Sequence, residues 1–221
     1  MKKFTIQNLS KIIRKTIGYA GIFVCVAFVF VAFSCKSIAQ EKPSVGKYST
    51  ELNEIESYLN NIKTLTAKFV QQTSEGSVIE GKFYLSRPGK MRIEYSNQPP
   101  VIIVVNGSVL SYYDVELDEI SRLSTNSTPA SLLTRQNISF YAKDVEVTNV
   151  TKKGNQVKVS LMKKNRKEAG EFSLVFDTKP LKFVKMEVKN DLDQTISVTL
   201  NNIEFDKEIA DSLFILKKSD K

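Results

Sequence analysis

The sequence has no histidine, no tryptophan and only two cysteines in 221 residues. Without histidine, no imidazole can act as a general base or a metal ligand, and no Ser-His-Asp triad can form. Both cysteines, Cys25 and Cys35, precede residue 40, so the rest of the chain has neither a disulfide framework nor a thiolate metal site. No G-x-x-x-x-G-K-[ST] segment occurs, so any nucleotide-driven step belongs to a partner. We expect a protein that is not an enzyme and holds no cofactor or metal.

The basic excess of the chain is confined to its beginning. The formal net charge is +8, but six of the 32 basic residues and none of the 24 acidic ones precede Gln40. The remaining 26 basic side chains nearly balance the 24 acidic ones. Charge therefore gives little support to a nucleic-acid-binding role, and we expect no nucleic-acid partner.

The first 39 residues have the pattern of a secretory signal peptide. A basic segment leads into the uncharged apolar run Ile17–Phe33. The small residues Ser37 and Ala39 then occupy the −3 and −1 positions of a cut before Gln40. We therefore predict a cleaved signal peptide over residues 1–39.

Two other fates of this segment stay open. The apolar run approaches the length that spans a bilayer, so it could be kept as an anchor. Cys35 could instead carry lipid, although Phe33 and Ala32 fit the bacterial lipobox poorly. After this segment we expect a polar linker over residues 40–47 and a single domain over residues 48–221.

The segment Ser49–Lys63 is predicted to form an amphipathic helix. Its apolar residues recur three and four positions apart and make one stripe: Leu52, Ile55, Leu59 and Ile62. Ser49 or Thr50 is the expected N-cap, because a hydroxyl there can accept a hydrogen bond from the first helical turn.

After this helix the apolar period changes to two residues. Short alternating segments are separated by turn residues, and Asn106-Gly107 predicts a hairpin with a type I′ turn. We count about ten or eleven strands and find no alternation of strands with long helices, which a parallel sheet would need. The sequence predicts a mainly β protein with a few covering helices, built on an antiparallel sheet wide enough to curl.

A second, short helix is predicted from Thr128 to Gln136. Thr128 is expected to be its N-cap and Pro129 its first helical residue, where proline is well tolerated. Its apolar residues are Leu132 and Leu133. Near the end of the chain, Glu208–Leu216 could form one more helical turn or a strand.

Large apolar side chains gather on one face of the predicted strands, which we take to be the concave face. They are Phe69, Phe83, Leu85, Met91, Ile93, Tyr95, Leu110 and Tyr112. Two interpretations stay open. The face is either an ordinary packed core or the lining of a cavity for an apolar ligand, with the two helices as a lid.

Two charged turns also allow two interpretations each. The acidic cluster Asp114–Glu119 is either a solvated hairpin turn or a calcium site. The basic run Lys163–Lys167 is either a solvated loop or a docking site for an acidic partner or anionic lipid headgroups.

As a set, these segments resemble the periplasmic outer-membrane lipoprotein carriers of the LolA family. The matching stretches are "LTAKFVQQ", "GKFYLSRPGKMRIEY", "VVNGSVLSYYD", "TPASLL" and "DSLF". They occur in the family's order and span Tyr48–Leu216. The resemblance implies an incomplete, strongly curved antiparallel β-barrel, closed by a helical lid over a hydrophobic cavity that holds the acyl chains of lipoproteins.

The resemblance also implies partners and a role for one arginine. A member of this family works in the periplasm of a Gram-negative bacterium, as a monomer, between an ABC-type releasing complex of the inner membrane and an acceptor on the outer membrane. Arg87, the arginine of the "RP" element, would hold the lid closed by hydrogen bonds to the lid backbone. A membrane-fixed acceptor, or another lipid-binding or regulatory module on the same fold, is the alternative.

Overall fold

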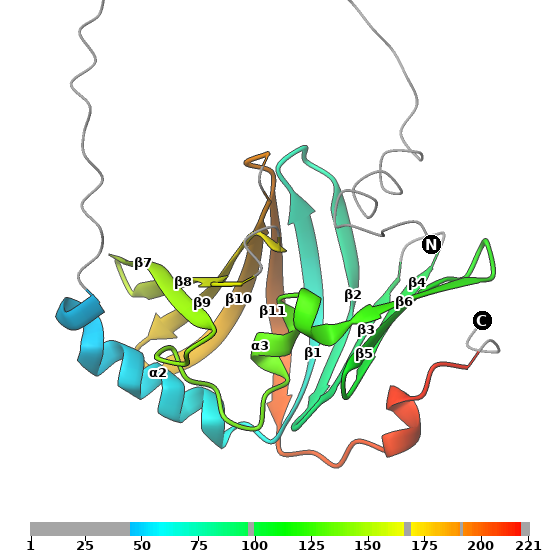
Figure 1. The fold of residues 1–221 in the computed structure, drawn as a ribbon, viewed down its shortest axis with the longest axis horizontal. Coiled ribbons are helices and arrows are strands. Elements are labelled where there is room, and N and C mark those ends of the chain that lie inside the picture. The colour runs from blue at the N-terminus through cyan, green and yellow to red at the C-terminus, as the bar shows by residue number, and fades with distance from the viewer. Residues whose placement is uncertain (1–44, 97–99, 166–168, 191, 218–221) are drawn as a thin grey trace, which may run out of the picture. The chain divides into compact units, whose positions relative to one another are not determined.

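The computed structural model describes residues 45–96, 100–165, 169–190 and 192–217, so the predicted signal peptide lies outside the described residues. In the unit Pro43–Lys221, the described residues contain one curved antiparallel sheet of eleven strands (Figure 1). The strands are β1 (Thr64–Thr73), β2 (Val78–Ser86), β3 (Lys90–Tyr95), β4 (Val101–Asn106), β5 (Val109–Asp114), β6 (Glu119–Ser124), β7 (Val145–Lys153), β8 (Gln156–Lys163), β9 (Glu171–Thr178), β10 (Leu181–Lys189) and β11 (Thr195–Phe205).

The order of the strands leaves the sheet unclosed. It runs β6-β5-β4-β3-β2-β1-β11-β10-β9-β8-β7, so the first and last strands are neighbours and β6 and β7 are the two edges. The ladder shifts register at three places: between Thr66 and Lys68, between Phe183 and Lys185, and between Val147 and Asn149. Such irregularities bend a strand and increase its twist. The predicted curved antiparallel sheet with few helices is confirmed.

The long predicted helix is present as α2 (Ser49–Asn61), but its predicted N-cap is wrong. A 3₁₀ turn, η1 (Val45–Tyr48), leads directly into it, so Tyr48 takes the N-cap position and no side chain caps the helix. Because the chain has already turned through η1, Ser49 and Thr50 lie inside the helix. Leu52, Ile55, Leu59 and Ile62 are all buried, as the stripe predicted.

The second helix is only one turn long, and its N-cap also differs from the prediction. It consists of α3 (Ala130–Leu133) and follows a 3₁₀ turn, η2 (Thr125–Ser127). The hydroxyl of Thr128 donates to the carbonyl of Thr125 at 2.8 Å instead of accepting a bond from α3, and Pro129 takes the N-cap position. Together with the chain up to Asp144, these turns link the edge strands β6 and β7 across the concave side (Figure 1).

The hairpin predicted between β4 and β5 is present, with a different turn. Asn106 pairs with Val109, so Gly107 and Ser108 are the central residues. Gly107 has a φ of +60°, whereas Ser108 is not among the residues with positive φ. A type I′ turn needs positive φ at both positions, so that part of the prediction is wrong.

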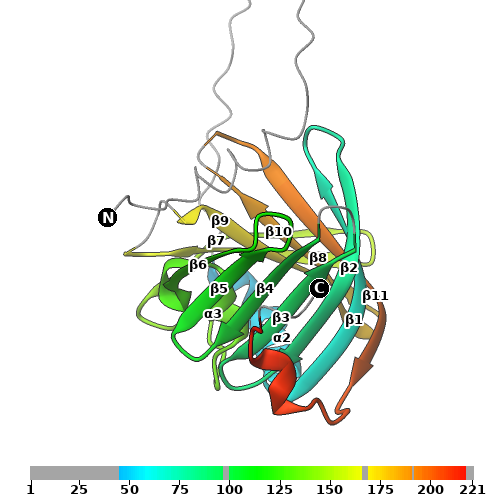
Figure 2. The ribbon, with the colours of Figure 1, turned by 90° about the vertical axis from the view of Figure 1, so that its right-hand side faces the viewer.

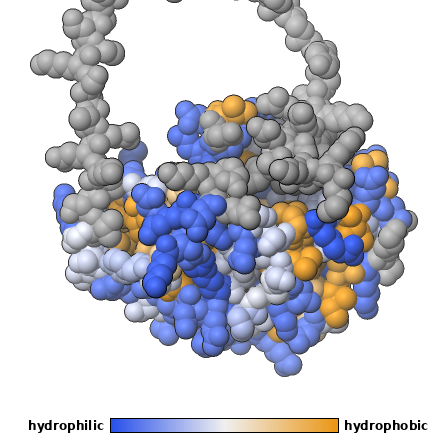
Figure 3. Space-filling model, in the orientation of Figure 1, coloured by the Kyte–Doolittle hydropathy of each residue, from blue (hydrophilic) through white to orange (hydrophobic). Residues whose placement is uncertain are grey.

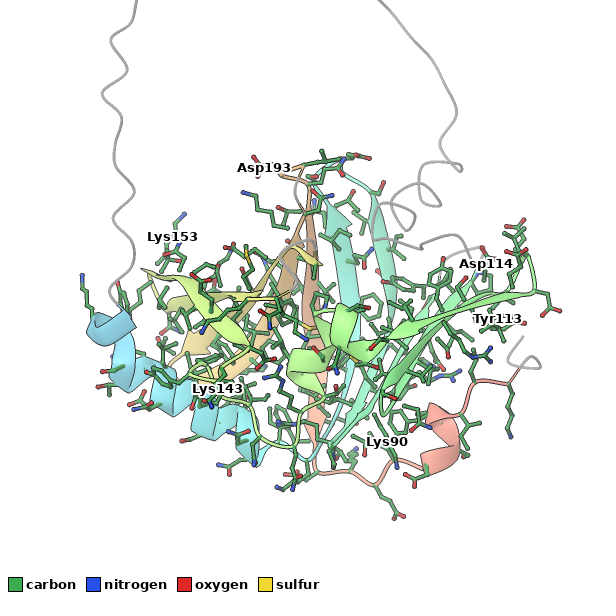
Figure 4. The ribbon with its side chains drawn as sticks, viewed as in Figure 1. Lys90, Tyr113, Asp114, Lys143, Lys153 and Asp193 are labelled. Atoms are coloured by element: carbon green, nitrogen blue, oxygen red, sulfur yellow. The ribbon has the colours of Figure 1, made fainter. Side chains whose placement is uncertain are left out.

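The tail of the chain covers part of the convex face. The 3₁₀ turn η4 (Asp211–Phe214) lies against the outer side of β3 and β4, where Phe214 packs on Ile102, Val104 and Tyr113 (Figure 2). Lys90 at the start of β3, labelled in Figure 4, forms a 2.6 Å ion pair with Asp211, the first residue of this turn. This contact explains why β4 is apolar on both faces: its concave face belongs to the main core, and its convex face lies under the tail. Within the described ranges, no helix is long and apolar enough to cross a membrane.

Candidate functional site

The register of the strands places the predicted cavity residues in rows across the concave face. Leu85 is paired with Met91, and Phe83 with Ile93. Leu110 and Tyr112 continue these two rows on β5, through Val105 and Ile103 of β4. Of the eight predicted residues, all but Tyr112 belong to the hydrophobic cluster that includes α2 and α3. The structure therefore brings the predicted set together on one face; contact with a ligand stays a prediction.

Helix α2 covers the half of the concave face that ends at the edge strand β7. The ring of Tyr58 meets Phe176 and Phe205 edge to face, with centroids 6.1 and 6.4 Å apart. The hydroxyl of Tyr58 accepts a hydrogen bond from the backbone N–H of Phe183 at 3.1 Å. Glu51 forms a 2.7 Å ion pair with Lys152 of β7. These contacts tie the helix to β7, β9, β10 and β11.

The other half of the concave face is less completely covered. On β3 to β6, large side chains of the concave rows are only partly buried: Ile93, Tyr95, Ile103, Leu110, Tyr112 and Leu123. Figure 3 shows apolar side chains at the surface in the region where Figure 1 places these strands. An apolar strip therefore continues from the covered core out to the surface. Sequence patterns missed Ile103 and Leu123. The "VIIVV" run is apolar throughout and shows no alternation, and the short strand β6 shows too little alternation to assign a buried face.

The corner between β2 and β3 forms hydrogen bonds to both α2 and the end of α3. The Nη2 atom of Arg87 donates to the backbone carbonyls of Leu59 and Ile62, the latter at 2.6 Å. These are carbonyls of the last turn and the C-cap of α2, where helical hydrogen bonding ends; the Leu59 carbonyl also accepts from the backbone N–H of Ile62 at 3.2 Å. Two residues on, the backbone N–H of Gly89 donates to the carbonyl of Thr134, at the end of α3, at 2.7 Å. Gly89 has a φ of +81°, a conformation that glycine adopts without strain.

The Arg87 side chain is held incompletely. Its Nε and Nη1 atoms are buried and have no hydrogen-bond partner among the described residues. Burial lowers the pKa of its guanidinium, because desolvation disfavours the charged form. The arginine therefore stabilises the end of α2 through one nitrogen while two others stay unsatisfied, and the net attachment is weak for a charged group.

Helix α2 and the link between the edge strands are also fastened to each other. The side-chain amide of Asn60 donates to the carbonyl of Ile138 at 2.9 Å and accepts from its N–H at 2.8 Å. The carboxylate of Glu56 accepts from the backbone N–H of Phe140. The Asn60 side chain therefore bonds both the N–H and the carbonyl of Ile138, and with Glu56 it attaches the link to the side of α2.

Buried Lys163 fastens α3 from the β8 side, which corrects the prediction that it lies in a solvated loop. It is the last residue of β8, and its Nζ donates to the carbonyl of Asn126 at 2.8 Å and to the hydroxyl of Ser131 at 2.9 Å. Its place in the strand could have been found from the sequence, because Val157, Val159 and Leu161 precede it at alternate positions. Residues 166–168 of the same run lie outside the described residues.

Arg135 and Asp144 form an ion pair within the link, and its effect can be measured. Nη1 of Arg135 lies 3.1 Å from Oδ1 of Asp144, and Nη2 donates to Oδ2. The Arg135 guanidinium holds the pKa of Asp144 below its ordinary value, with a smaller contribution from nearby Lys163. Since the folded-state pKa is the lower one, the pair stabilises the fold above the unfolded-state pKa. That stabilisation is lost as the pH falls through the folded-state pKa.

We expect the Arg135→Gln variant to bring the pKa of Asp144 back up toward that of a free aspartate. Carbon NMR titration of the side-chain carboxyl measures this directly. The matched variant Arg122→Gln, on β6, should leave the Asp144 titration unchanged. An Asp144 pKa that stays low in Arg135→Gln would contradict the assigned cause.

The acidic turn between β5 and β6 has a structural explanation. The carboxylate of Asp114 accepts from the backbone N–H groups of Glu116 and Leu117, both at 3.1 Å. Asp118 has a φ of +51° and accepts from the hydroxyl of Tyr113 at 2.9 Å. These bonds close the turn, as aspartates commonly do.

Comparison with known proteins identifies the family. A profile described as "Outer membrane lipoprotein carrier protein LolA" matches residues 60–217. The chain belongs to the LolA family. This match runs from the last turn of α2 to just beyond η4, so it includes the whole LolA-type sheet, the Arg87 corner and the link.

The chain is also similar to individual proteins. An outer-membrane lipoprotein carrier protein of Coxiella burnetii (strain CbuK_Q154) is 30% identical, over 94% of this chain and 95% of its own length. An uncharacterised protein of Rickettsia prowazekii is 23% identical, over 86% of each chain. The crystal structure of a LolA superfamily protein from Nitrosomonas europaea is similar with a TM-score of 0.46 and 9% identity, and it covers 75% of this chain and 97% of that one.

Proposed function

We propose that this protein carries lipidated proteins through the periplasm, with their acyl chains held against the concave face under α2 and the link. The observation that carries this proposal is the unevenly covered apolar face. Its β7–β11 half packs under α2, while apolar side chains on β3 to β6 stay partly exposed. An acyl chain can begin to bind on the exposed strip and extend into the covered half as the lid moves.

The energetics require such a cover and also require that it opens. Each CH₂ group removed from water gains about 0.8 kcal/mol, so acyl chains of ordinary length need continuous protection outside a membrane. A lid held by a few hydrogen bonds, each worth about 1 kcal/mol net and up to about 3 kcal/mol where a charged group donates, can be displaced by that gain. The weakly attached Arg87 fits the role of a latch on this lid, as the family resemblance implies.

The carrier proposal includes partners and a location. The chain would receive lipoproteins from an ABC-type complex in the inner membrane and pass them, as a monomer without catalytic activity of its own, to an outer-membrane acceptor. Export through a cleaved signal peptide would place it in the periplasm. N-terminal mass spectrometry separates this shuttle from a membrane-fixed acceptor, because only the shuttle begins at Gln40 without lipid.

The test is release of lipoproteins from spheroplasts that carry the matched inner-membrane complex. We expect the mature chain, Gln40–Lys221, to bring lipoproteins into the soluble fraction as stable complexes. The Ile93→Asp variant should lose this activity, because a carboxylate on the exposed apolar strip disfavours the entry of an acyl chain. Leu117→Asp is the matched control, since Leu117 is 63% exposed in the β5–β6 turn. No release by the folded wild-type chain would overturn the proposal.

A further inference from the structure

A small polar cluster interrupts the concave apolar face. Gln71 of β1 is only 6% exposed and lies on the same face as Leu65, Ala67 and Phe69, as the alternating burial of β1 shows. The hydroxyl of Tyr95 donates to its Oε1 at 2.8 Å. The Tyr95 ring stands edge to face against Phe69, with centroids 5.4 Å apart. A buried amide costs free energy unless it is bonded, so its place on a lipid-binding face needs a reason.

A second tyrosine belongs to this cluster. Tyr112 lies on the same concave face, one row from Tyr95, since Tyr112 pairs with Ile103 and Ile103 with Ile93. Burial raises the pKa of the Tyr95 phenol, and the neighbouring Tyr112 raises it further. The register of the strands therefore places the two tyrosines in adjacent rows of the same face.

The cluster has hydrogen-bond donors without acceptors. In the described part of the chain, the hydroxyl of Tyr112 has no hydrogen-bond partner, and only one of the two polar atoms of the Gln71 amide has one. Neither unpaired atom is among the fully buried unpartnered atoms, so both stay accessible. A ligand that fits here supplies carbonyl oxygens, because these accept hydrogen bonds and donate none.

We propose that the Gln71 amide and the Tyr112 hydroxyl bind the carbonyl groups of the ester linkages that join the acyl chains of the ligand to its glycerol, while Tyr95 holds the Gln71 amide in place through its own hydrogen bond. The cluster fixes a direction as well. Leu85, Met91 and Leu110 lie toward the Arg87 corner, where the tails would extend. Gln71 and Tyr95 lie toward the opposite rim, near the ends of β1 and β3. This site deepens the proposed carrier function and rests on it.

The test compares two ligands that differ only in these carbonyls. One is a short peptide with an N-terminal N-octanoyl-S-(2,3-dioctanoyloxypropyl)cysteine, and the other carries two octyl ethers in place of the esters. Binding to the mature chain is measured by displacement of a fluorescent apolar probe. We expect wild type to prefer the ester ligand about tenfold, which corresponds to about 1.4 kcal/mol.

Two variants remove the donors without changing the shape of the face. Tyr112→Phe, and Gln71→Leu combined with Tyr95→Phe so that no partner is left unpaired, should each reduce the preference to threefold or less and leave binding of the ether ligand unchanged. Tyr84→Phe, on the convex face, should keep the full preference. Thermal unfolding of each variant verifies that it is folded.

The outcomes separate this proposal from the one on which it rests. Equal binding of ester and ether ligands by wild type overturns carbonyl recognition and leaves the carrier function standing. A Tyr112→Phe variant that weakens both ligands equally also overturns it, because the hydroxyl would then shape the face rather than bind a carbonyl. Failure of folded wild type to bind either ligand overturns the carrier function itself.

Discussion

Replacement of Arg87 by leucine is expected to loosen the end of α2 and to change ligand exchange. The variant leaves the carbonyls of Leu59 and Ile62 without the nitrogen that now binds both. Hydrogen bonds to charged groups are worth about 1.5–3 kcal/mol each, but relief of the two unsatisfied guanidinium nitrogens offsets part of the loss. We expect the local opening free energy of α2 to fall by about 2 kcal/mol, or about 30-fold in the opening equilibrium.

Hydrogen exchange of the α2 amides measures this effect, and acyl-ligand binding should change with it. A lid that is more often open leaves a larger fraction of the free protein competent to bind, so the apparent affinity for an acyl ligand should rise. Arg87→Lys is the matched control: its ammonium keeps the charge but not the planar fork, so an intermediate effect is expected. Unchanged exchange of α2 in Arg87→Leu would show that the arginine does not act as a latch.

Replacement of Gly81 by alanine is expected to be the most destabilising single-methyl change on β2. A Cβ atom at Gly81 would lie 2.1 Å from the carbonyl oxygen of Glu94 and 2.5 Å from the ring of Phe69. Neither neighbour can withdraw easily, because one is ladder backbone and the other is a 2% exposed ring packed against Tyr95. We expect a loss of about 3 kcal/mol, the upper range for overpacking, and a fall in Tm of about 10 °C.

Thermal unfolding tests this expectation against a neighbouring substitution. Lys82→Ala changes the adjacent, exposed residue, whose side chain points to the opposite face, and should alter the Tm by about 1 °C or less. A Gly81→Ala protein that melts within that range of wild type would mean that the sheet can shift locally. The position of the Phe69 ring would then not depend on the absence of a side chain at residue 81.

The elements with strong periodicity were predictable from the sequence, and long-range attachments were not. The stripe on α2 and the change of period at Leu65 gave the helix, the following strands and the face to be buried. The N-caps were wrong because 3₁₀ turns precede both helices, and single-residue capping preferences do not register such turns. The convex cluster under Phe214 was missed because it depends on where the tail returns, which no local pattern specifies.

The candidate site divides in the same way. Eight residues of the concave face follow from alternation alone, and the role of Arg87 came from the resemblance, now accompanied by its two backbone bonds. The reciprocal bond of Asn60 to Ile138 joins residues 78 positions apart, and the polarity of Asn60 suits a solvated helix end equally well. In the sequence, Gln71 is a polar exception in an apolar alternation, and nothing nearby indicates a partner for it. Its partner Tyr95 lies on β3, and only the pairing of β1 and β3 with β2 brings the two together.

The strand order has a consequence for capacity. A closed barrel has a fixed circumference, since every strand is bonded on both sides and widening breaks a ladder. Here the edge strands β6 and β7 do not pair with each other in the described sheet, and the chain from Thr125 to Asp144 that connects them is a tether of limited length. Spreading of the two arms would break no ladder bond between strands, but it would have to loosen the bonds that fasten this connection to α2. Under the carrier function proposed above, an unclosed sheet would let one protein enclose cargo with different numbers and lengths of chains.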